Sequence, residues 1–331
     1  MDLSIREAAM AVRASHAFTR FFSGVNLESA EFGKARLRIT EVSDSLRSPG
    51  YRFSRHSLMS KVETDCGVVS FGYGEGPTRM IALQKSIAES VERSVSAIAH
   101  RSDQSIITSS GWAAYLTEEG AMDRAKNELL ERDALLLHWL GSVPQSPIQS
   151  DSLPRPFRQW IATELSRSPR FNKVTFLVSN LGEVPVLSAF IHDDSNFGFF
   201  SHSTGNTLER SLSHCLEEAC RLADLYQKGF IRRATGASEA HVIFHSEDAP
   251  VPQAMLSGDS MNYFEAQRIW ALARRKVTTI SDFKFNVSKC GPLHIAFCDS
   301  AQVQKLFFGS TERAAEQGRV NLAREIGRAH V

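Results

Sequence analysis

The same acidic pattern occurs twice in this chain, each time where apolar residues repeat with the period of a helix. The two copies read AESVERSVS at residues 88–96 and NELLERDALLLHW at residues 127–139. Each contains a glutamate, two intervening residues and then Glu-Arg, and residues three apart share one face of a helix. Two carboxylates therefore lie side by side on each helix, and the chain must fold so that their charges are compensated.

A loop of small residues precedes each acidic helix, and a third unit of the same plan follows. The loops span residues 66–77, 108–116 and 201–207. The helices that we predict after them cover residues 78–99 with Thr78 as N-cap, a segment from Thr117 as N-cap through Trp139, and residues 208–226 with Glu217 and Glu218 near the middle.

Strands are predicted between and around these units. Apolar runs typical of strands occur at residues 35–40, 173–178, 184–192, 240–245 and 293–299. Further helices are expected at residues 4–14, 262–275 and 311–325, and a Pro- and Ser-rich connection around one short helix at residues 144–170. This order predicts an α+β fold with mixed sheets, and the uneven spacing of the units excludes a solenoid.

Composition excludes several classes of protein. The 331 residues are 42% hydrophobic and 23% charged with a net charge of +1, so no basic field favours nucleic acid or a membrane. The N-terminus, MDLSIREAAM, lacks the apolar stretch of a secretion signal. The five cysteines show no metal-ligand spacing, which is typical of reduced thiols in a cytoplasmic protein.

The simplest interpretation of one Glu-x-x-Glu is a pair of solvated carboxylates. Here the pair recurs after small-residue loops, and leucines surround the second copy, which indicates a buried helix. Buried neighbouring carboxylates need a cation, and Mg²⁺ takes carboxylates together with waters and substrate phosphates. Glycine- and serine-rich loops before helices offer N–H groups to phosphate, and Arg93 and Arg132 could neutralise its oxygens. The residues therefore predict a Mg²⁺–nucleotide site built from helices, without a P-loop or a kinase motif.

Three blocks carry a resemblance to a known family. They are GEGPTRMIALQKSIAESVERSVS at residues 74–96, SSGWAAYLTEEGAMDRAKNELLERDALLLHWL at residues 109–140 and VSNLGEVPVLSAFIHDD at residues 178–194. In this order they resemble the YcaO family, most of all its azoline-forming cyclodehydratases of thiazole/oxazole-modified peptide pathways. The resemblance covers about residues 70–226, and the block that contains ELLERDA is its most specific part.

The resemblance implies a YcaO-type fold that holds ATP and Mg²⁺ between helices. The residues that it assigns to the metal are Glu89, Glu92, Glu128, Glu131 and Glu218. The residues that the loops and the resemblance together assign to the nucleotide are Gly74, Gly76, Ser109, Ser110, Arg132 and Arg221. The chain departs from the family where the family more often has Lys, Asn, Arg and Gln, at Glu75, Ser110, His214 and Arg221 respectively. The catalytic residues stay unassigned, because the family's proline-rich C-terminal tail is not found.

The implied chemistry is cyclodehydration of a peptide backbone. A cysteine, serine or threonine of a ribosomally made precursor attacks the preceding amide carbonyl, ATP phosphorylates the oxygen, and loss of phosphate gives a thiazoline or oxazoline. The implied partners are the precursor peptide, a separate leader-peptide-binding E1-like protein and a flavin dehydrogenase, in a homodimer or hetero-complex. Two alternatives stay open: a YcaO enzyme that forms a thioamide or amidine, and a non-catalytic YcaO-like scaffold subunit.

The two ends of the chain shape the expected domain organisation. Residues 1–65 are expected to form an N-terminal helix and strand region, too short for a leader-binding domain, and residues 66–331 the catalytic core. Residues 326–331, IGRAHV, match a reading frame of a sequencing adapter, so we expect the native C-terminus to be missing.

Several other side chains have local interpretations. Trp112 and Tyr115 could stack on adenine or pack in the core. Asp193 and Asp194 are expected to form a turn at the end of a strand. The segment RRKVTT at residues 274–279 is interpreted as a solvated helix end.

Overall fold

A computed structural model describes part of the chain in detail. The described residues are 25–29, 32–44, 56–102, 110–141, 144–179, 181–195, 197–227, 229, 258–275 and 278–303. The segments predicted at residues 4–14, 240–245 and 311–325 lie outside them. The chain divides into two compact units, Met1–Lys126 with Lys284–Asp299 and Asn127–Phe283 with Ser300–Val331. The boundary that we expect between residues 65 and 66 stays a prediction.

The first unit is built on a seven-stranded antiparallel sheet. Its strands in chain order are β1 (Val25–Ser29), β2 (Gly33–Asp44), β3 (His56–Thr64), β4 (Val69–Gly76), β5 (Trp112–Tyr115), β10 (Lys284–Cys290) and β11 (Leu293–Asp299). Across the sheet their order is β4-β3-β2-β1-β10-β11-β5, which leaves β4 and β5 at the two edges. The predicted strands at residues 35–40 and 293–299 are confirmed as parts of β2 and β11. The strands β1, β3 and β10 were not predicted, because strands with a single buried face contain no continuous apolar run. The expected loop at residues 108–116 is wrong in part, because it contains the short edge strand β5.

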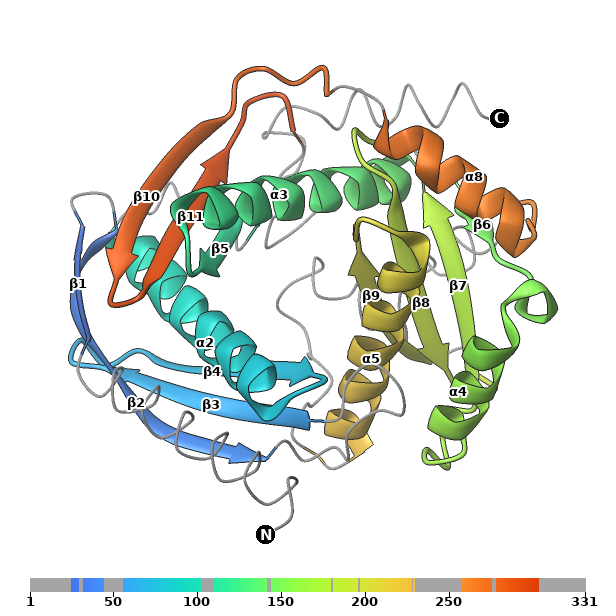
Figure 1. Cartoon of the computed structure of the whole chain (residues 1–331), viewed down its shortest axis with the longest axis horizontal. Helices are drawn as coiled ribbons and strands as arrows, with labels where there is room; N and C mark the ends of the chain where they lie inside the picture. Colours follow the sequence, from blue (N-terminus) through green and yellow to red (C-terminus); the bar gives the residue numbers. More distant parts are fainter. Residues whose placement is uncertain are drawn as a thin grey trace, which may run out of the picture. The chain divides into compact units, whose positions relative to one another are not determined.

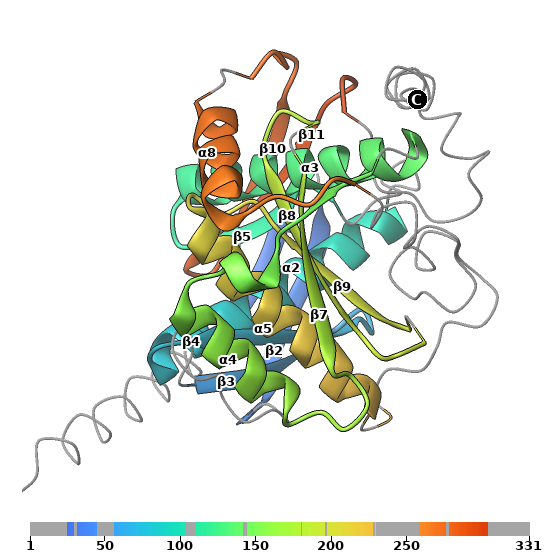
Figure 2. The same cartoon turned by 90° about the vertical axis from the view of Figure 1, so that its right-hand side faces the viewer.

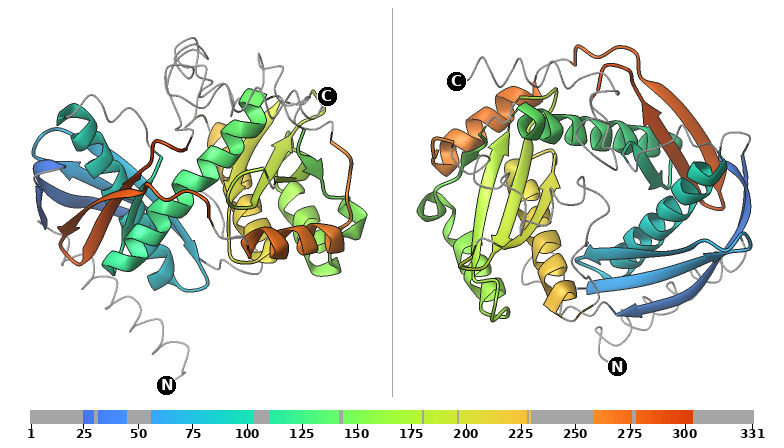
Figure 3. Two further views of the ribbon diagram at one scale, coloured as in Figure 1. Left: turned by 90° about the horizontal axis from the view of Figure 1, so that it is seen from above. Right: turned by 180° about the vertical axis from the view of Figure 1, so that it is seen from behind.

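Helix α2 (Arg79–Ser102) lies along β3 and β4 in the curve of this sheet (Figure 1 and Figure 3). Its predicted N-cap is confirmed, because Thr78 Oγ1 accepts the N–H of Ile81 at 3.2 Å. The helix buries Leu83, Ile87 and Val91 in the core that it shares with the sheet. The helix predicted from periodicity therefore has the expected buried face.

The glycine-rich segment before α2 is a strand and not a loop, which corrects our expectation. A Cβ atom on Gly74 would overlap the carbonyl oxygen of Ala82, and one on Gly72 would overlap that of Ser86. Gly76 would meet the side chain of Ile81 in the same way. These glycines therefore allow β4 to lie against α2, and their use is close packing.

The second unit is built on a four-stranded antiparallel sheet. Its strands, in order across the sheet, are β6 (Ser146–Pro147), β7 (Lys173–Ser179), β8 (Val186–His192) and β9 (Gly198–Ser203). Its helices are α4 (Arg155–Leu165), α5 (Leu208–Gln227) and α8 (Tyr263–Arg274), with a short 3₁₀ turn at Ser150–Ser152. The helix α3 (Glu118–Gly141) begins in the first unit and continues in the second, and Thr117 Oγ1 caps it by accepting the N–H of Gly120 at 3.2 Å.

One core joins α4, α5 and α8 to the four-stranded sheet, beside which Figure 2 shows them. The strand β8 is buried along its whole length, as a central strand covered on both faces should be. Leu187 belongs to the core with the helices, whereas Phe190 packs with Leu177 and Phe200 in a separate apolar cluster.

The predicted α+β fold class is confirmed. All strand pairs within the two sheets are antiparallel over the described ranges, and the mixed pairing that we expected is limited to a parallel bridge between Ile148 and Met261. None of the helices in these ranges is both long and apolar enough to cross a membrane.

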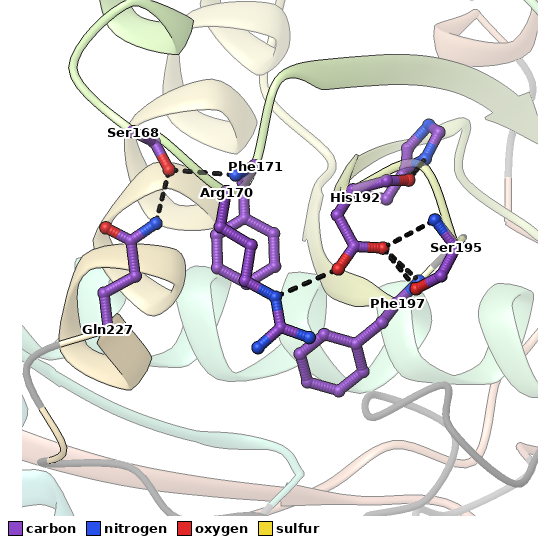
Figure 4. A network of polar contacts seen from close by, with 8 residues as sticks. Ser168, Arg170, Phe171, His192, Ser195, Phe197 and Gln227 are labelled. Atoms are coloured by element: carbon purple, nitrogen blue, oxygen red, sulfur yellow. Dashed lines mark hydrogen bonds and ion pairs between the residues drawn. The ribbon is translucent and has the colours of Figure 1, made fainter.

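A polar network ties the turn between β8 and β9 to the start of β7 (Figure 4). Arg170 Nε donates to Asp193 Oδ2 at 3.0 Å, while Asp193 Oδ1 accepts the N–H groups of Ser195 and Phe197 at 2.9 and 3.1 Å. The guanidinium also lies over the rings of Phe197 and Tyr226, at 4.5 and 5.4 Å from their centroids. The turn expected at Asp193 is therefore confirmed, and a cation held between aromatic rings supports it.

Replacing Gly74 by alanine tests the close packing of β4 on α2. We expect Gly74→Ala to lower the free energy of unfolding by about 2–4 kcal/mol, because backbone atoms of the strand or helix must move. Gly67→Ala is the matched control, since Gly67 has a φ of +79° but no atom within 4 Å of its would-be Cβ. That strain costs about 1–2 kcal/mol. Urea unfolding measures both, and an equal or smaller loss in Gly74→Ala would contradict the packing.

Candidate functional site

The first acidic pair, on α2, binds the two edge strands of the seven-stranded sheet. Glu89 Oε2 accepts the N–H of Tyr73 on β4, and Glu92 Oε2 accepts the N–H of Ala114 on β5 at 3.3 Å. Side chains three apart on a helix have Cβ atoms only about 5–6 Å apart. Both edge strands of the sheet therefore lie at the same turn of α2, and the two glutamates connect these strands through the helix.

Arg93 completes this arrangement on β4. Its Nη2 forms an ion pair with Glu89 Oε1, and its Nη1 donates to the carbonyl oxygen of Phe71 at 2.7 Å. Glu89 and Arg93 thus bind N–H and C=O groups of an edge strand as a neighbouring strand would. We expected a cation to balance the negative charge of this acidic pair. Backbone N–H groups and Arg93 supply part of that balance, so a Mg²⁺ ion at Glu89 would share the carboxylate with Arg93 and the N–H of Tyr73.

The second acidic pair, on α3, interacts with Arg132 and with Glu218 of α5. Arg132 Nη1 lies 3.9 Å from Glu131 Oε1. Burial raises the pKa of Glu131, the charge of Arg132 opposes that rise, and the carboxylate of Glu218 adds to it. Burial lowers the pKa of Arg132, but Glu131, Glu128 and Glu218 outweigh burial and raise it above its ordinary value. The charges on the two helices are therefore mutually dependent.

A second arginine belongs to the same group. Arg221 Nη2 lies 3.4 Å from Glu218 Oε1, one turn further along α5. We call the set the α3–α5 cluster, and its members are Glu128, Glu131, Arg132, Glu218 and Arg221. The structure therefore brings together five of the residues predicted for the metal and nucleotide, from segments almost ninety positions apart in the sequence.

The α3–α5 cluster suits a Mg²⁺–nucleotide ligand by the chemistry of its donors. A divalent cation is most favourable beside a carboxylate whose pKa is raised by burial and by a neighbouring carboxylate, as it is at Glu131. Mg²⁺ usually takes one or two carboxylates and completes its shell with waters and phosphates. Over the residues that the structure covers, no three His, Cys, Asp or Glu side chains converge as a ready metal site. Phosphate and water would therefore supply the remaining ligands.

The other predicted nucleotide residues lie in the first unit or outside the described ranges. Gly74 and Gly76 face α2 in β4, and Ser110 is buried just before β5. Ser109 is outside the described residues. Trp112 packs in the core, with its ring stacked at 4.7 Å on Phe297, so core packing holds for one of the two aromatic residues that we considered for adenine.

Three residues of the site region were not predicted from the sequence. Thr204, after β9, donates its backbone N–H to Glu131. Arg274 of α8 bonds to the same loop, and our interpretation of it as part of a solvated helix end is wrong. Helical phase could have indicated this, because Arg274 follows the buried Trp270 by four residues and so shares its face.

His202 of β9 is buried, with Nδ1 2.9 Å from a serine hydroxyl, and burial and the charge of Arg132 lower its pKa well below the ordinary value.

An α+β fold in which two helices bring together partly buried glutamates and arginines is suited to a protein that binds Mg²⁺ and a nucleotide without a P-loop. The family described as YcaO cyclodehydratase, ATP- and Mg²⁺-binding, matches residues 95–290, more than half of the chain. The chain belongs to the YcaO family. ATP and Mg²⁺ are the ligands of that family, which confirms the expected cofactors. The match includes the α3–α5 cluster and begins just after Glu92.

Solved structures show the same fold at low sequence identity. A YcaO protein from Methanopyrus kandleri, bound with AMPPCP and Mg²⁺, is 11% identical with a TM-score of 0.55, over 79% of this chain and 85% of that one. A heterocyclase in complex with substrate and cofactor is 12% identical with a TM-score of 0.53, over 87% of this chain and 52% of that one. A chain of the E. coli microcin synthetase McbBCD complex is 12% identical with a TM-score of 0.50, over 83% and 89%. No curated protein matches the chain.

The buried His202 predicts a loss of stability in mild acid. Its folded pKa is below its ordinary value, so as the pH falls through about 6.5 the unfolded chain binds a proton that the folded chain does not. The free energy of unfolding therefore declines below that pH, and His202→Asn should weaken the decline. His214→Asn, which changes an exposed histidine of α5, is the control. Urea unfolding over a pH series measures the slope, and an unchanged slope in His202→Asn would disprove this assignment.

Proposed function

We propose that this chain is an ATP-dependent cyclodehydratase subunit that converts cysteine, serine or threonine residues of a ribosomally made peptide to thiazolines or oxazolines. The observation that carries the proposal is the α3–α5 cluster, in which Arg132 interacts with Glu128, Glu131 and Glu218, and Glu218 also pairs with Arg221. Phosphoryl transfer needs positioning and charge neutralisation more than covalent catalysis by the protein. Partly buried acidic and basic groups on two helices meet that need.

Each member of the cluster has a role in this proposal. Glu128, Glu131 and Glu218 would supply one or two carboxylates to a bound Mg²⁺ ion, and Arg132 and Arg221 would bind phosphate oxygens through charge-assisted hydrogen bonds. Bound Mg²⁺–ATP supplies the phosphoryl group that makes the amide oxygen of the peptide a leaving group. The raised pKa of Arg132 keeps that side chain cationic while it neutralises phosphate charge.

The overall reaction conserves atoms without an oxidant. The side-chain sulfur or oxygen of the peptide forms a bond to the preceding carbonyl carbon, and the carbonyl oxygen leaves as part of inorganic phosphate. The amide nitrogen loses its proton and forms a double bond to the same carbon. The products are one azoline ring, ADP and phosphate, which together account for the removal of one water from the peptide.

The proposed partners are a precursor peptide and a separate protein that binds its leader, within a homodimer or hetero-complex. Two similar folds support this: a heterocyclase solved with its substrate, and a chain of the McbBCD complex. A flavin dehydrogenase that oxidises the azolines is a further proposed partner. All five cysteines are free thiols, which fits the proposed cytoplasmic location.

Ligand-dependent unfolding of the purified chain tests the ATP site without a peptide. Mg²⁺–ATP at about 100 times its Kd should raise the free energy of unfolding by roughly 2.7 kcal/mol. Glu128→Gln and Glu131→Gln should each weaken nucleotide affinity about tenfold or more, because each removes one carboxylate from a shared Mg²⁺ shell. Glu119→Gln, an exposed position on the same helix, is the control. A folded wild-type chain without a Mg²⁺-dependent shift would refute an autonomous ATP site.

The mass of a co-produced precursor peptide tests the reaction itself. We expect the loss of one water per ring with the wild-type chain and no loss with Glu131→Gln. Unchanged peptide output from Glu131→Gln would identify a non-catalytic scaffold. Replacement of oxygen by sulfur would indicate thioamide formation, and loss of water with consumption of an amine would indicate an amidine.

A further inference from the structure

Arg274, the last residue of α8, holds the loop that joins β9 to α5. Its Nη2 donates to the carbonyl oxygen of Thr204, to that of Gly205 at 2.9 Å and to the hydroxyl of Thr204 at 3.2 Å. The loop is braced further, because the Thr204 hydroxyl donates to the carbonyl of Pro185 at 2.9 Å and the Gly205 N–H donates to Ser211 Oγ at 2.8 Å. One guanidinium nitrogen thus binds two consecutive carbonyls of a short loop.

The same loop also binds the α3–α5 cluster. The Thr204 N–H donates to Glu131, and the loop leads directly into α5, which carries Glu218. Arg274 thus binds the carbonyl oxygen of Thr204, while the carboxylate of Glu131 accepts the N–H of Thr204. A shift of this carbonyl would turn the neighbouring backbone and so change the direction of the hydrogen bond that Glu131 receives.

Two observations separate Arg274 from an arginine that only stabilises the fold. Its Nε is buried without a hydrogen-bond partner over the ranges that the structure describes, whereas structural arginines rarely leave a buried donor unpaired. Its charge also acts on Glu131, so it belongs to the electrostatics of the cluster. Trp270, one turn earlier on α8, makes a simpler contact, because its Nε1 donates only to the Gly205 carbonyl at 3.2 Å.

We propose that Arg274 is a positioning residue of the Mg²⁺–nucleotide site, which sets the orientation of Glu131 by holding the Thr204 and Gly205 carbonyls. This inference rests on the proposed function, since it concerns the same site. It assigns to α8 a role in metal affinity that lies outside the acidic helices.

The test compares two changes on the same helix that loosen the same loop in different places. Arg274→Met removes the bonds to Thr204 and Gly205, whereas Trp270→Phe removes only the bond to Gly205. Arg274→Lys keeps the charge and one donor, and remains informative if the methionine variant does not fold. Arg268→Met, an exposed position of α8, is the control.

The first measurement is hydrogen exchange of the Thr204 amide in the ligand-free chain. We expect about tenfold faster exchange in Arg274→Met, a smaller increase in Arg274→Lys, and exchange within about twofold of the wild type in Trp270→Phe and Arg268→Met. Unchanged exchange in both Arg274 variants would overturn the proposal, whatever the chain binds.

The second measurement is the Mg²⁺ concentration that gives half of the ATP-dependent thermal stabilisation. We expect it to rise about tenfold in Arg274→Met and to change less than about twofold in Trp270→Phe, even if both lower the melting temperature without ligand. An equal rise in both variants would show that Arg274 acts only through general stability, and would overturn its positioning role. Absence of any Mg²⁺-dependent shift in the wild type would instead defeat the proposed function, and the Thr204 exchange would still decide whether Arg274 holds the loop.

Discussion

Carboxylate charge inside a protein has to be balanced, and the compensation of paired glutamates organises both units of this chain. Removing one partner of a buried ionic group leaves an uncompensated charge, which is far more costly than a lost surface ion pair. The first unit balances its pair with backbone N–H groups and Arg93. In the second unit Glu131 interacts with the carboxylate of Glu218, and burial raises the pKa of Glu131. The two copies of one pattern therefore meet the same constraint in different ways.

In the first unit the two glutamates bind both edges of the seven-stranded sheet. Two edge strands would otherwise present unpaired backbone groups, and α2 offers a carboxylate to each of them. Close approach of β4 to the helix requires the glycines at positions 72 and 74. Close packing thus accounts for the glycines of β4, while phosphate binding at Gly74 and Gly76 stays a prediction and the α3–α5 cluster supplies further donors suited to Mg²⁺ and phosphate.

Prediction from sequence succeeded where a local pattern decides the outcome. Helical periodicity and threonine caps located α2 and α3, and continuous apolar runs located β7 and β8. It failed for β3 and β10, whose outward faces are polar. It also failed for Arg274, because a basic residue at a helix end is normally solvated, and only the neighbouring loop reveals its partner.

The sequence by itself determined the family, the α+β class and the acidic helices, because residue type and spacing along a helix are enough to place two carboxylates on one face. Only the tertiary structure decided that Glu218 and Arg221 join the second pair, that the first pair binds the edges of a sheet, and that α8 reaches the loop at Thr204. Those contacts join residues far apart in the chain, and their electrostatics depend on burial, which is a property of the folded protein.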